Sequence, residues 1–329
     1  MTNRKVNQFD VSIVIVCMNN LHNLYPCLES IRKYTTEVTY ATFVVAYLFT
    51  KDNLEKAKAD FSWVTFIESN EIRGFSENNN LALKQAKGKY CFVLNDDTEM
   101  QMPVIDGLFE TIENLPKEVA AISPRSVFGD GMQQSCGRPK HTIWTYILSS
   151  LKMWDEQRSP SPYVNQKGVF KTYDLWGAFF LIRTDIFRQM GWFDERYYFS
   201  PEDIALSRKL NRAGYHCYVD SKMTIIHYEG MTGKGISPLQ LATKPASFKG
   251  NLIYYADESS IRFFLISLLF FVLAIFSFIF HLSKSITGSA RERNRILYHC
   301  DVNCMSICFL DLTPKQIFVR YAKPYLKLN

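Results

Sequence analysis

The sequence contains no dense block of lysine and arginine, although its 38 basic and 32 acidic residues leave a net charge of +6. Nucleic-acid-binding proteins usually carry such a block, so we set nucleic acid aside as a partner. A mildly basic chain is better suited to anionic lipid or phosphate. Internal repeats and low-complexity segments are also absent, and 329 residues suffice for a large domain with an appendage or for two domains.

The first ten residues lack the apolar core of a secretory signal peptide. We therefore expect the main domain to lie in a reducing cytoplasm, where cysteines remain thiols. Several of the eight cysteines lie inside apolar, strand-like runs, in which a thiol behaves as a small hydrophobe. Cys300, Cys304 and Cys308 instead recur at helical spacing beside His299. Because this is not a common zinc spacing, we interpret it as a membrane-facing, acylated helix face.

Short apolar runs alternate with helix-like segments through the first third of the chain. The runs at 11–16, 42–48, 63–68 and 90–94 are rich in β-branched and aromatic residues. This alternation predicts βαβ units and an α/β fold with a mostly parallel sheet. Further along we expect helices at 102–115, 184–190 and 202–212, strands at 120–127, 173–182 and 224–228, and an irregular, mobile loop over a site at 138–166.

The run from Tyr90 to Leu94 ends in three consecutive polar residues, Asn95, Asp96 and Asp97. The carboxyl ends of strands are where open α/β sheets bind ligands. Two adjacent carboxylates repel each other unless a cation or several hydrogen-bond donors hold them. The alternative is a polar turn in which these side chains cap the next segment.

A second region begins where the composition changes, so we place a main domain at 1–238 and a helical region at 239–329. From 263 to 280 no residue is charged, and Ser267 and Ser277 are the only polar side chains. Such a helix would be about 27 Å long, close to the hydrocarbon thickness of a bilayer. Its apolar residues cover every face, which predicts a membrane-associated helix at about 263–282.

The charges that flank this helix leave its orientation open. Arg262 precedes the apolar run, whereas Lys284, Arg291, Arg293 and Arg295 follow it. If the helix spans the membrane once and the main domain is cytosolic, the more basic flank lies outside, against the positive-inside rule. A re-entrant or in-plane helix keeps both flanks in the cytosol and removes the conflict.

A series of short motifs then follows in one fixed order along the chain. The motifs are Val14-Ile15 with Asn19, Cys27 to Ser30, Gly74-Phe75 with Asn79-Asn80, Leu94 to Asp97, Pro124 with Asp130-Gly131, Gly177-Ala178 with Ile182-Arg183, Gly191 to Glu195, Glu202-Asp203 and His227. As an ordered set over residues 10–230 they resemble the family 2 inverting glycosyltransferases, in particular the rhamnosyltransferase-like enzymes of surface polysaccharide synthesis.

The resemblance implies a GT-A fold, a dTDP- or UDP-sugar donor and a divalent metal, Mg²⁺ or Mn²⁺. Asn95-Asp96-Asp97 matches the Asp-x-Asp-type motif of the family, with Asn95 standing where other members have Asp. Asp97 would bind the metal, and Asn95 and Asp96 would face the ribose and phosphate. His227 would either complete the metal site or be a hydrogen-bonded core residue. Further donor-binding candidates are Asn19, Gly74, Asn79, Asn80 and Gly177.

Glu202 and Asp203 match the acidic pair that supplies the base in the family. Inversion needs a carboxylate near the acceptor hydroxyl, on the face of the sugar opposite the leaving group. We assign this role to Asp203 and the orientation of the acceptor to Glu202. The alternative is that both acids stabilise a helix dipole in its first turn. Ala205 departs from the family, which usually has a further acid at this position.

These expectations describe an inverting, hexosyl-type glycosyltransferase on the cytoplasmic face of the cell membrane. Its partners would be a nucleotide-sugar, a glycan acceptor that is lipid-linked, the membrane and a second copy of the chain. One alternative is a non-catalytic scaffold of a polysaccharide assembly, because the second strand (Val44 to Leu48) lacks the Asp that holds the nucleoside in many members. Another is a sugar nucleotidyltransferase, although Cys17 to Asn20 lacks the glycines of its phosphate loop.

Overall fold

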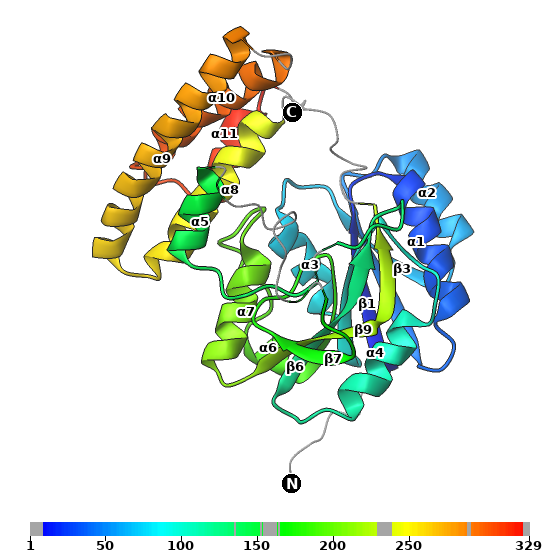
Figure 1. Ribbon diagram of the computed structural model, residues 1–329. Helices are drawn as coiled ribbons and strands as arrows, with labels where there is room; N and C mark the ends of the chain where they lie inside the picture. Colours follow the sequence, from blue (N-terminus) through cyan, green and yellow to red (C-terminus); the bar gives the residue numbers. More distant parts are fainter. Residues whose placement is uncertain are drawn as a thin grey trace. The chain divides into compact units, whose positions relative to one another are not determined.

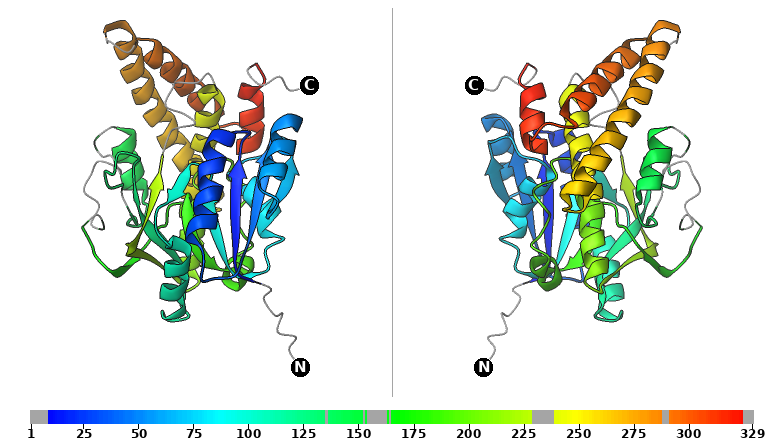
Figure 2. Two further views of the ribbon diagram at one scale, coloured as in Figure 1. Left: turned by 90° about the vertical axis from the view of Figure 1, so that its right-hand side faces the viewer. Right: turned by 90° about the vertical axis from the view of Figure 1, so that its left-hand side faces the viewer.

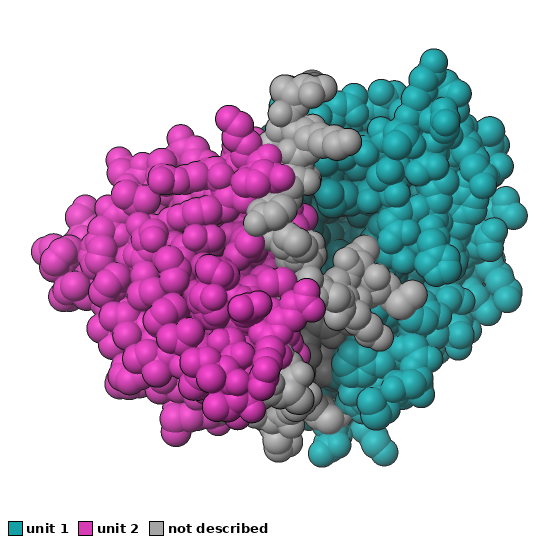
Figure 3. Space-filling model, turned by 90° about the horizontal axis from the view of Figure 1, so that it is seen from above, with its two compact units in different colours: residues 1–140, 160–194, 203–231 teal, residues 141–159, 195–202, 232–329 magenta. Residues whose placement is uncertain are grey.

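A computed structural model of the chain describes residues 9–134, 136–151, 153, 163, 165–228, 239–287 and 291–324. It divides into two compact units, coloured teal and magenta in Figure 3. Unit 1 comprises residues 1–140, 160–194 and 203–231, and unit 2 comprises residues 141–159, 195–202 and 232–329. The sequence analysis placed the boundary between the main domain and the helical region after residue 238. Residues 229–238 lie outside the described residues, so this boundary stays a prediction.

Unit 1 is built on a mixed sheet of nine strands among the described residues (Figure 1). The strand order is β3-β2-β1-β4-β8-β6-β9-β5, and β7 pairs with β9 beside this path. The strands are β1 (Phe9–Cys17), β2 (Tyr40–Tyr47), β3 (Val64–Ser69), β4 (Gly88–Asn95), β5 (Thr98–Met100), β6 (Val119–Val127), β7 (Val169–Thr172), β8 (Phe179–Arg183) and β9 (His216–His227).

The sheet changes direction between β4 and β8. Strands β3, β2, β1 and β4 are mutually parallel, as the alternation of strands and helices predicted. Strand β8 is antiparallel to β4, with Leu94 opposite Phe179. The carboxyl end of β4, with its acidic residues, therefore meets the amino end of β8.

Helices cover both faces of the sheet, because its central strands are apolar on both sides (Figures 1 and 2). Phe92 and Leu94 of β4 pack with the helices of one face, and Cys91 and Val93 pack with those of the other. The first face carries α1 (Leu21–Tyr34), α2 (Lys51–Asp60) and α4 (Val104–Glu113), and the second carries α3 (Phe75–Leu83), α6 (Thr184–Gln189) and α7 (Glu202–Arg212).

Several segments differ from the sequence prediction, including β9, which begins at His216 and not at residue 224. Strands β5 and β7 are too short to show an alternating pattern and were not predicted. Residues 173–178 precede β8 instead of belonging to it, so Gly177 lies in a turn. The segment 138–166, predicted as an irregular loop, contains helix α5 (Ile143–Ser150), which begins with a Thr142 capping box and belongs to unit 2.

Unit 2 is helical in its described part, with α5 joined by four C-terminal helices. Its core includes Leu252, Phe270 and Cys308, and Tyr146 of α5 stacks on Phe270 with ring centroids 4.5 Å apart. The C-terminal helices are α8 (Gln240–Ala256), α9 (Ser260–Thr287), α10 (Arg291–Ile307) and α11 (Pro314–Ala322).

The predicted apolar helix lies within α9, which has a mean hydropathy of 2.9 over its most apolar window. In the described part of the chain, only α9 is long and apolar enough to cross a membrane. Only 22% of that window is buried inside the protein. Most of the apolar surface of α9 is therefore exposed.

The interpretation of the α10 cysteines as an acylated, membrane-facing row was wrong. Cys300, Cys304 and Cys308 are all buried, and Cys300 Sγ lies 3.4 Å from the carbonyl oxygen of Gln240 in α8. Their spacing places them on the face of α10 that packs inward. All eight cysteines are free and buried, and they pack as small hydrophobic side chains.

Phe92 offers a test of the two-faced sheet because it is fully buried in the middle of β4. Phe92→Ala should lower the free energy of unfolding by about 3–5 kcal/mol, measured by urea denaturation, because it leaves a cavity in the core. The exposed neighbour Lys87 is the control, and Lys87→Ala should change stability by less than about 0.5 kcal/mol. A loss at Phe92 no larger than that at Lys87 would contradict this packing.

Candidate active site

The acidic segment after β4 is held by its own backbone. Asn95 N donates a 2.7 Å hydrogen bond to the carbonyl oxygen of Ala178, just before β8. The carbonyl oxygen of Asn95 accepts a 2.8 Å hydrogen bond from Thr98 Oγ1. These two contacts fix the turn that carries Asp96 and Asp97 between β4 and β5.

Asp97 and His227 are brought together by the pairing of β5 with β9. Thr98 lies opposite His227 in this pair, and Tyr228 N donates to the carbonyl oxygen of Asp97 at 2.9 Å. As a result His227 Nε2 lies 3.4 Å from Asp97 Oδ1, with 13% and 10% of the two side chains exposed. The two residues predicted as metal ligands are far apart in sequence, but their side chains therefore lie next to each other.

This pair fits a divalent cation. Asp97 Oδ1 is buried and has no hydrogen-bond partner among the described residues, so an acceptor is left for a cation. A carboxylate with an imidazole suits Mn²⁺ better than Mg²⁺. The described residues contain no group of three or more His, Cys, Asp or Glu side chains able to hold a metal. The remaining atoms that coordinate the cation would therefore come from the molecule bound beside Asp97 and from water.

Asp96 lies in a less favourable environment for a charged carboxylate. Burial raises its pKa to about 6, and the neighbouring charge of Asp97 adds to this increase. A hydrogen bond with Cys17 acts in the opposite direction, and the pKa of that buried thiol is raised by burial and by Asp96. A bound cation or hydrogen-bond donor would offset the cost of charging this carboxyl.

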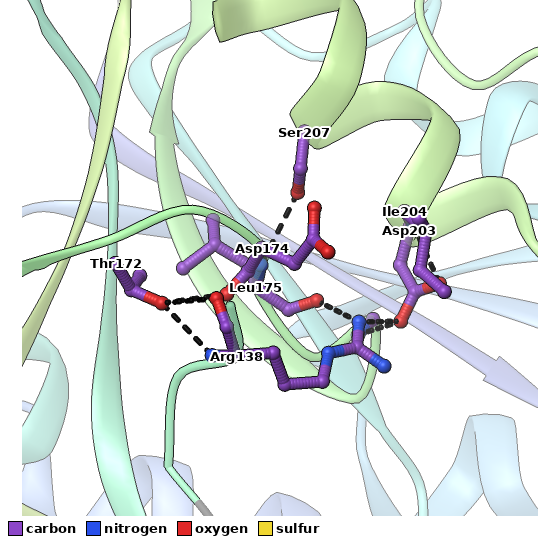
Figure 4. A network of polar contacts seen from close by, with 8 residues as sticks. Arg138, Thr172, Asp174, Leu175, Asp203, Ile204 and Ser207 are labelled. Carbon is purple, nitrogen blue, oxygen red and sulfur yellow. Dashed lines mark hydrogen bonds and ion pairs between the residues drawn. The ribbon is translucent and has the colours of Figure 1, made fainter. Parts of the chain in front are cut away.

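The carboxylate of Asp203, near the start of α7, is held by three donors (Figure 4). Arg138 Nη2 lies 2.7 Å from Asp203 Oδ2, and Gly177 N donates to the same oxygen at 3.1 Å. Asp203 Oδ1 accepts a 2.7 Å hydrogen bond from Ile204 N. Because 16% of the Asp203 side chain remains exposed, the carboxylate is both oriented and accessible.

The sequence analysis missed Arg138, whose side chain is only 5% exposed. Thr172 Oγ1 accepts from Arg138 N at 2.9 Å, which ties this residue to β7. The guanidinium also donates to the carbonyl oxygen of Leu175 and lies 4.3 Å from the ring centroid of Trp176. A single arginine in an irregular segment gives no sequence signal, so only the fold reveals this partner of Asp203.

Gly177 connects the two acidic centres. A Cβ on Gly177 would lie 3.2 Å from Asp203 Cβ, tighter than most real contacts. The next residue, Ala178, accepts the hydrogen bond from Asn95 N. One turn before β8 therefore touches the Asp203 carboxylate on one side and the acidic end of β4 on the other.

The predicted donor residues Asn19 and Gly74 lie at helix and strand ends of unit 1. Asn19, after β1, has a left-handed φ of 50° and accepts hydrogen bonds from Thr50 N at 3.1 Å and Asn53 Nδ2 at 2.9 Å. Gly74 is the N-cap residue of α3, and its N donates to Glu77 Oε2 at 3.1 Å. These hydrogen bonds do not test whether Asn19 and Gly74 bind a nucleotide-sugar, and that role stays a prediction.

Asn79 and Asn80 are buried in α3, where their amides bond to the backbone. Asn80 Nδ2 donates to the carbonyl oxygen of Phe193 at 2.9 Å, and Asn80 Oδ1 accepts from Phe193 N at 3.2 Å. Asn79 Nδ2 donates to the carbonyl oxygen of Phe75 at 3.0 Å. These contacts give both amides a role in holding α3. That either amide contacts a nucleotide-sugar stays a prediction.

Glu202 opens α7 and is 9% exposed. The boundary between the two units falls between these acids, so Glu202 belongs to unit 2 and Asp203 to unit 1. The predicted role of Glu202 in orienting an acceptor therefore stays a prediction.

Unit 1 has the GT-A fold, and known structures share it. The fold resembles GalNAc-T7, solved with UDP, GalNAc and Mn²⁺, at a TM-score of 0.52 and 15% identity over 76% of this chain and 50% of that one. The mannosyltransferase PcManGT from Pyrobaculum calidifontis, solved with GDP-Man and Mn²⁺, gives a TM-score of 0.51 and 12% identity over 97% of this chain and 88% of that one. Likenesses at this identity establish the fold alone.

The chain belongs to glycosyl transferase family 2, whose family model matches residues 12–191. It is 26% identical over 154 residues to the O-antigen biosynthesis protein RfbC of Myxococcus xanthus, covering 46% of this chain and 12% of that protein. It is 26% identical over 172 residues to the rhamnosyltransferase WbbL of Escherichia coli K12, covering 49% of this chain and 62% of that protein.

A third relative is the N-acetylglucosaminyl-diphospho-decaprenol L-rhamnosyltransferase of Mycobacterium tuberculosis, 37% identical over 87 residues and 26% of this chain. The match covers 27% of that protein, so this chain spans less than two thirds of each of these relatives. The predicted family, fold and likeness to rhamnosyltransferases are confirmed.

The Asp97–His227 pair can be tested by metal binding alone. Asp97→Ala should weaken Mn²⁺ binding at least tenfold, about 1.4 kcal/mol, in the presence of UDP or dTDP, because it removes the carboxylate oxygen that lies 3.4 Å from His227 Nε2. Electron paramagnetic resonance of free Mn²⁺ measures this affinity, and His227→Ala should give a smaller loss. The exposed acid Asp52 on α2 is the control. An Asp97 variant that binds Mn²⁺ like Asp52→Ala would remove Asp97 from the metal site.

Proposed function

We propose that this protein is an inverting, metal-dependent glycosyltransferase that moves a sugar from a dTDP- or UDP-sugar to a glycan acceptor that is lipid-linked, in surface polysaccharide synthesis. One observation carries the proposal. The Asp203 carboxylate, held by Arg138 and Gly177, is joined through the Gly177-Ala178 turn to the strand end that carries Asp97 beside His227. A base and a diphosphate site are the two parts that inverting transfer requires.

Support for the donor comes from the chemistry of the strand end. A divalent cation held by Asp97 and His227 would neutralise the charge that develops on the departing nucleoside diphosphate. Asn95 and Asp96 offer an amide and a carboxyl to the ribose and phosphate. The structural relatives were solved with UDP or GDP-Man and Mn²⁺, which supports this class of donor.

Asp203 is the residue that we propose as the base. Its Oδ2 is fixed by Arg138 and Gly177, so an acceptor hydroxyl would donate its proton to a carboxylate whose orientation is already set. The acceptor oxygen then attacks the anomeric carbon from the face opposite the diphosphate, which inverts the configuration. Arg138 touches neither sugar in this scheme and acts as a positioning residue.

Support for the acceptor and the location comes from the relatives and from α9. The named relatives act in O-antigen biosynthesis, as a rhamnosyltransferase, and on N-acetylglucosaminyl-diphospho-decaprenol. A long, exposed apolar helix would keep the enzyme in the plane of such a lipid. We therefore place the protein at the cytoplasmic face of the cell membrane.

The donor can be identified with the purified protein. Release of nucleoside diphosphate should be measured with a panel of dTDP- and UDP-sugars in the presence of Mn²⁺ and a membrane-lipid extract as acceptor. One donor should give release that depends on the extract and on the metal. If no donor in the panel supports release, the proposed function is wrong.

Asp203→Asn keeps the shape of the side chain but removes the base. The rate of transfer should fall by about 10²–10⁴-fold, the usual contribution of a general base, while donor binding measured by calorimetry stays unchanged. Glu202→Gln, the same kind of change at the preceding residue, is the control variant and should mainly raise the KM for the acceptor. An Asp203→Asn protein that also fails to bind donor would refute the assignment of the base.

Gly177→Ala tests whether the position of Asp203 matters. The new Cβ would press on Asp203 Cβ, so kcat should fall about tenfold or more, equivalent to about 1.4 kcal/mol, with little change in Mn²⁺ affinity. Thermal unfolding checks that the protein remains folded. An unchanged kcat would mean that the carboxylate tolerates displacement and is not the base.

A further inference from the structure

Helix α9 has two different faces along its whole length. Large apolar side chains recur on one face at helical spacing and are exposed, in several cases by more than half: Phe264, Leu265, Leu268, Val272, Phe276 and Ile279. The opposite face is buried at Ser267, Phe270, Ala274 and His281. The apolar residues that seemed to cover all sides of a spanning helix are therefore divided between the protein core and the surface.

The buried face of α9 carries polar groups that tie it to its neighbours. His281 Nδ1 lies 2.6 Å from Asp301 Oδ2 of α10, and Ser277 Oγ donates to Asp301 Oδ1 at 3.0 Å. Lys244 of α8 completes the cluster, with Nζ 2.7 Å from Asp301 Oδ1. Buried charges of this kind cost free energy unless they remain paired, so α9 stays attached to α8 and α10.

Helix α10 runs beside α9 and cannot enter hydrocarbon. The rings of Phe278 in α9 and Tyr298 in α10 are 6.0 Å apart, and Phe309, just after α10, lies 5.7 Å from Phe271 in the middle of α9. α10 contains several charged residues besides Asp301, and three of its arginines are exposed. A spanning α9 would bring the buried Asp301 carboxylate and the Lys244 ammonium group paired with it toward the bilayer core, which is strongly unfavourable.

The charges at one end of the apolar face match an anionic surface. Lys284, near the end of α9, is exposed, as are Arg291, Arg293 and Arg295 at the start of α10, against the single acid Glu292. Cations beside an apolar helix face are typical of helices that lie in the headgroup region of anionic membranes.

We infer that α9 lies in the plane of an anionic membrane surface, with its exposed apolar face in contact with lipid, and does not cross the bilayer. The inference rests on the proposed function for the membrane as partner. It is tested without sugar transfer, so a failure here is distinct from a failure of the proposed activity. The alternatives are a spanning α9 and a second copy of the chain covering its apolar face.

Vesicle flotation tests the lipid contact with the full chain. The protein should float with phosphatidylcholine vesicles that contain phosphatidylglycerol, and bind at least tenfold less to phosphatidylcholine alone. Phe276→Glu should reduce binding at least tenfold, whereas the exposed unit 1 residue Met132, changed to Glu, should have no effect. Binding that is unchanged by Phe276→Glu would overturn the inference.

Chemical labelling distinguishes the in-plane helix from a spanning one. Ser260→Cys and Thr287→Cys place thiols at the two ends of α9, while the native cysteines are buried. In sealed, inverted membrane vesicles an impermeant maleimide should label both ends. Labelling at one end only would show a spanning helix and overturn the inference. So would a detergent-free dimer that Phe276→Glu converts to a monomer without any loss of lipid binding.

Discussion

A single backbone hydrogen bond, from Asn95 N to the carbonyl oxygen of Ala178, joins the two halves of the candidate active site. It exists because β8 runs antiparallel to β4, which places the turn before β8 against the end of β4. The acidic residues of the first half lie on one side of this bond. Gly177 and the Asp203 carboxylate lie on the other, so the position of this carboxylate depends on the reversal in the sheet.

The Arg138–Asp203 ion pair depends on the same region. A buried pair contributes little to stability on its own, because desolvation offsets most of the attraction. What it supplies here is orientation, since the guanidinium is also held by the carbonyl oxygen of Leu175 and by the Trp176 ring. The fold therefore sets the direction of the Asp203 carboxylate in the absence of any bound molecule. Proton transfer at a fixed geometry requires such an oriented group.

Unit 2 shows why composition alone does not decide how an apolar helix meets a membrane. An apolar run of this length is typical of a spanning segment. Yet its interior face carries Ser277 and His281, which meet Asp301 and Lys244 from two other helices. A charged neighbour bound along the helix changes the favoured arrangement from spanning to lying in the interface.

Local patterns were enough to predict the α/β fold, the acidic end of β4 and the apolar helix, because each is a pattern of hydrophobicity or a contiguous motif. The sequence also indicated Asp97, His227 and Asp203, although only by the order of motifs in a family. Only the tertiary structure decided that Asp97 meets His227, that Arg138 holds Asp203, that the α10 cysteines are buried and that α9 is covered on one face. These contacts join residues distant in sequence, and no local periodicity encodes which strands pair or which helix faces meet.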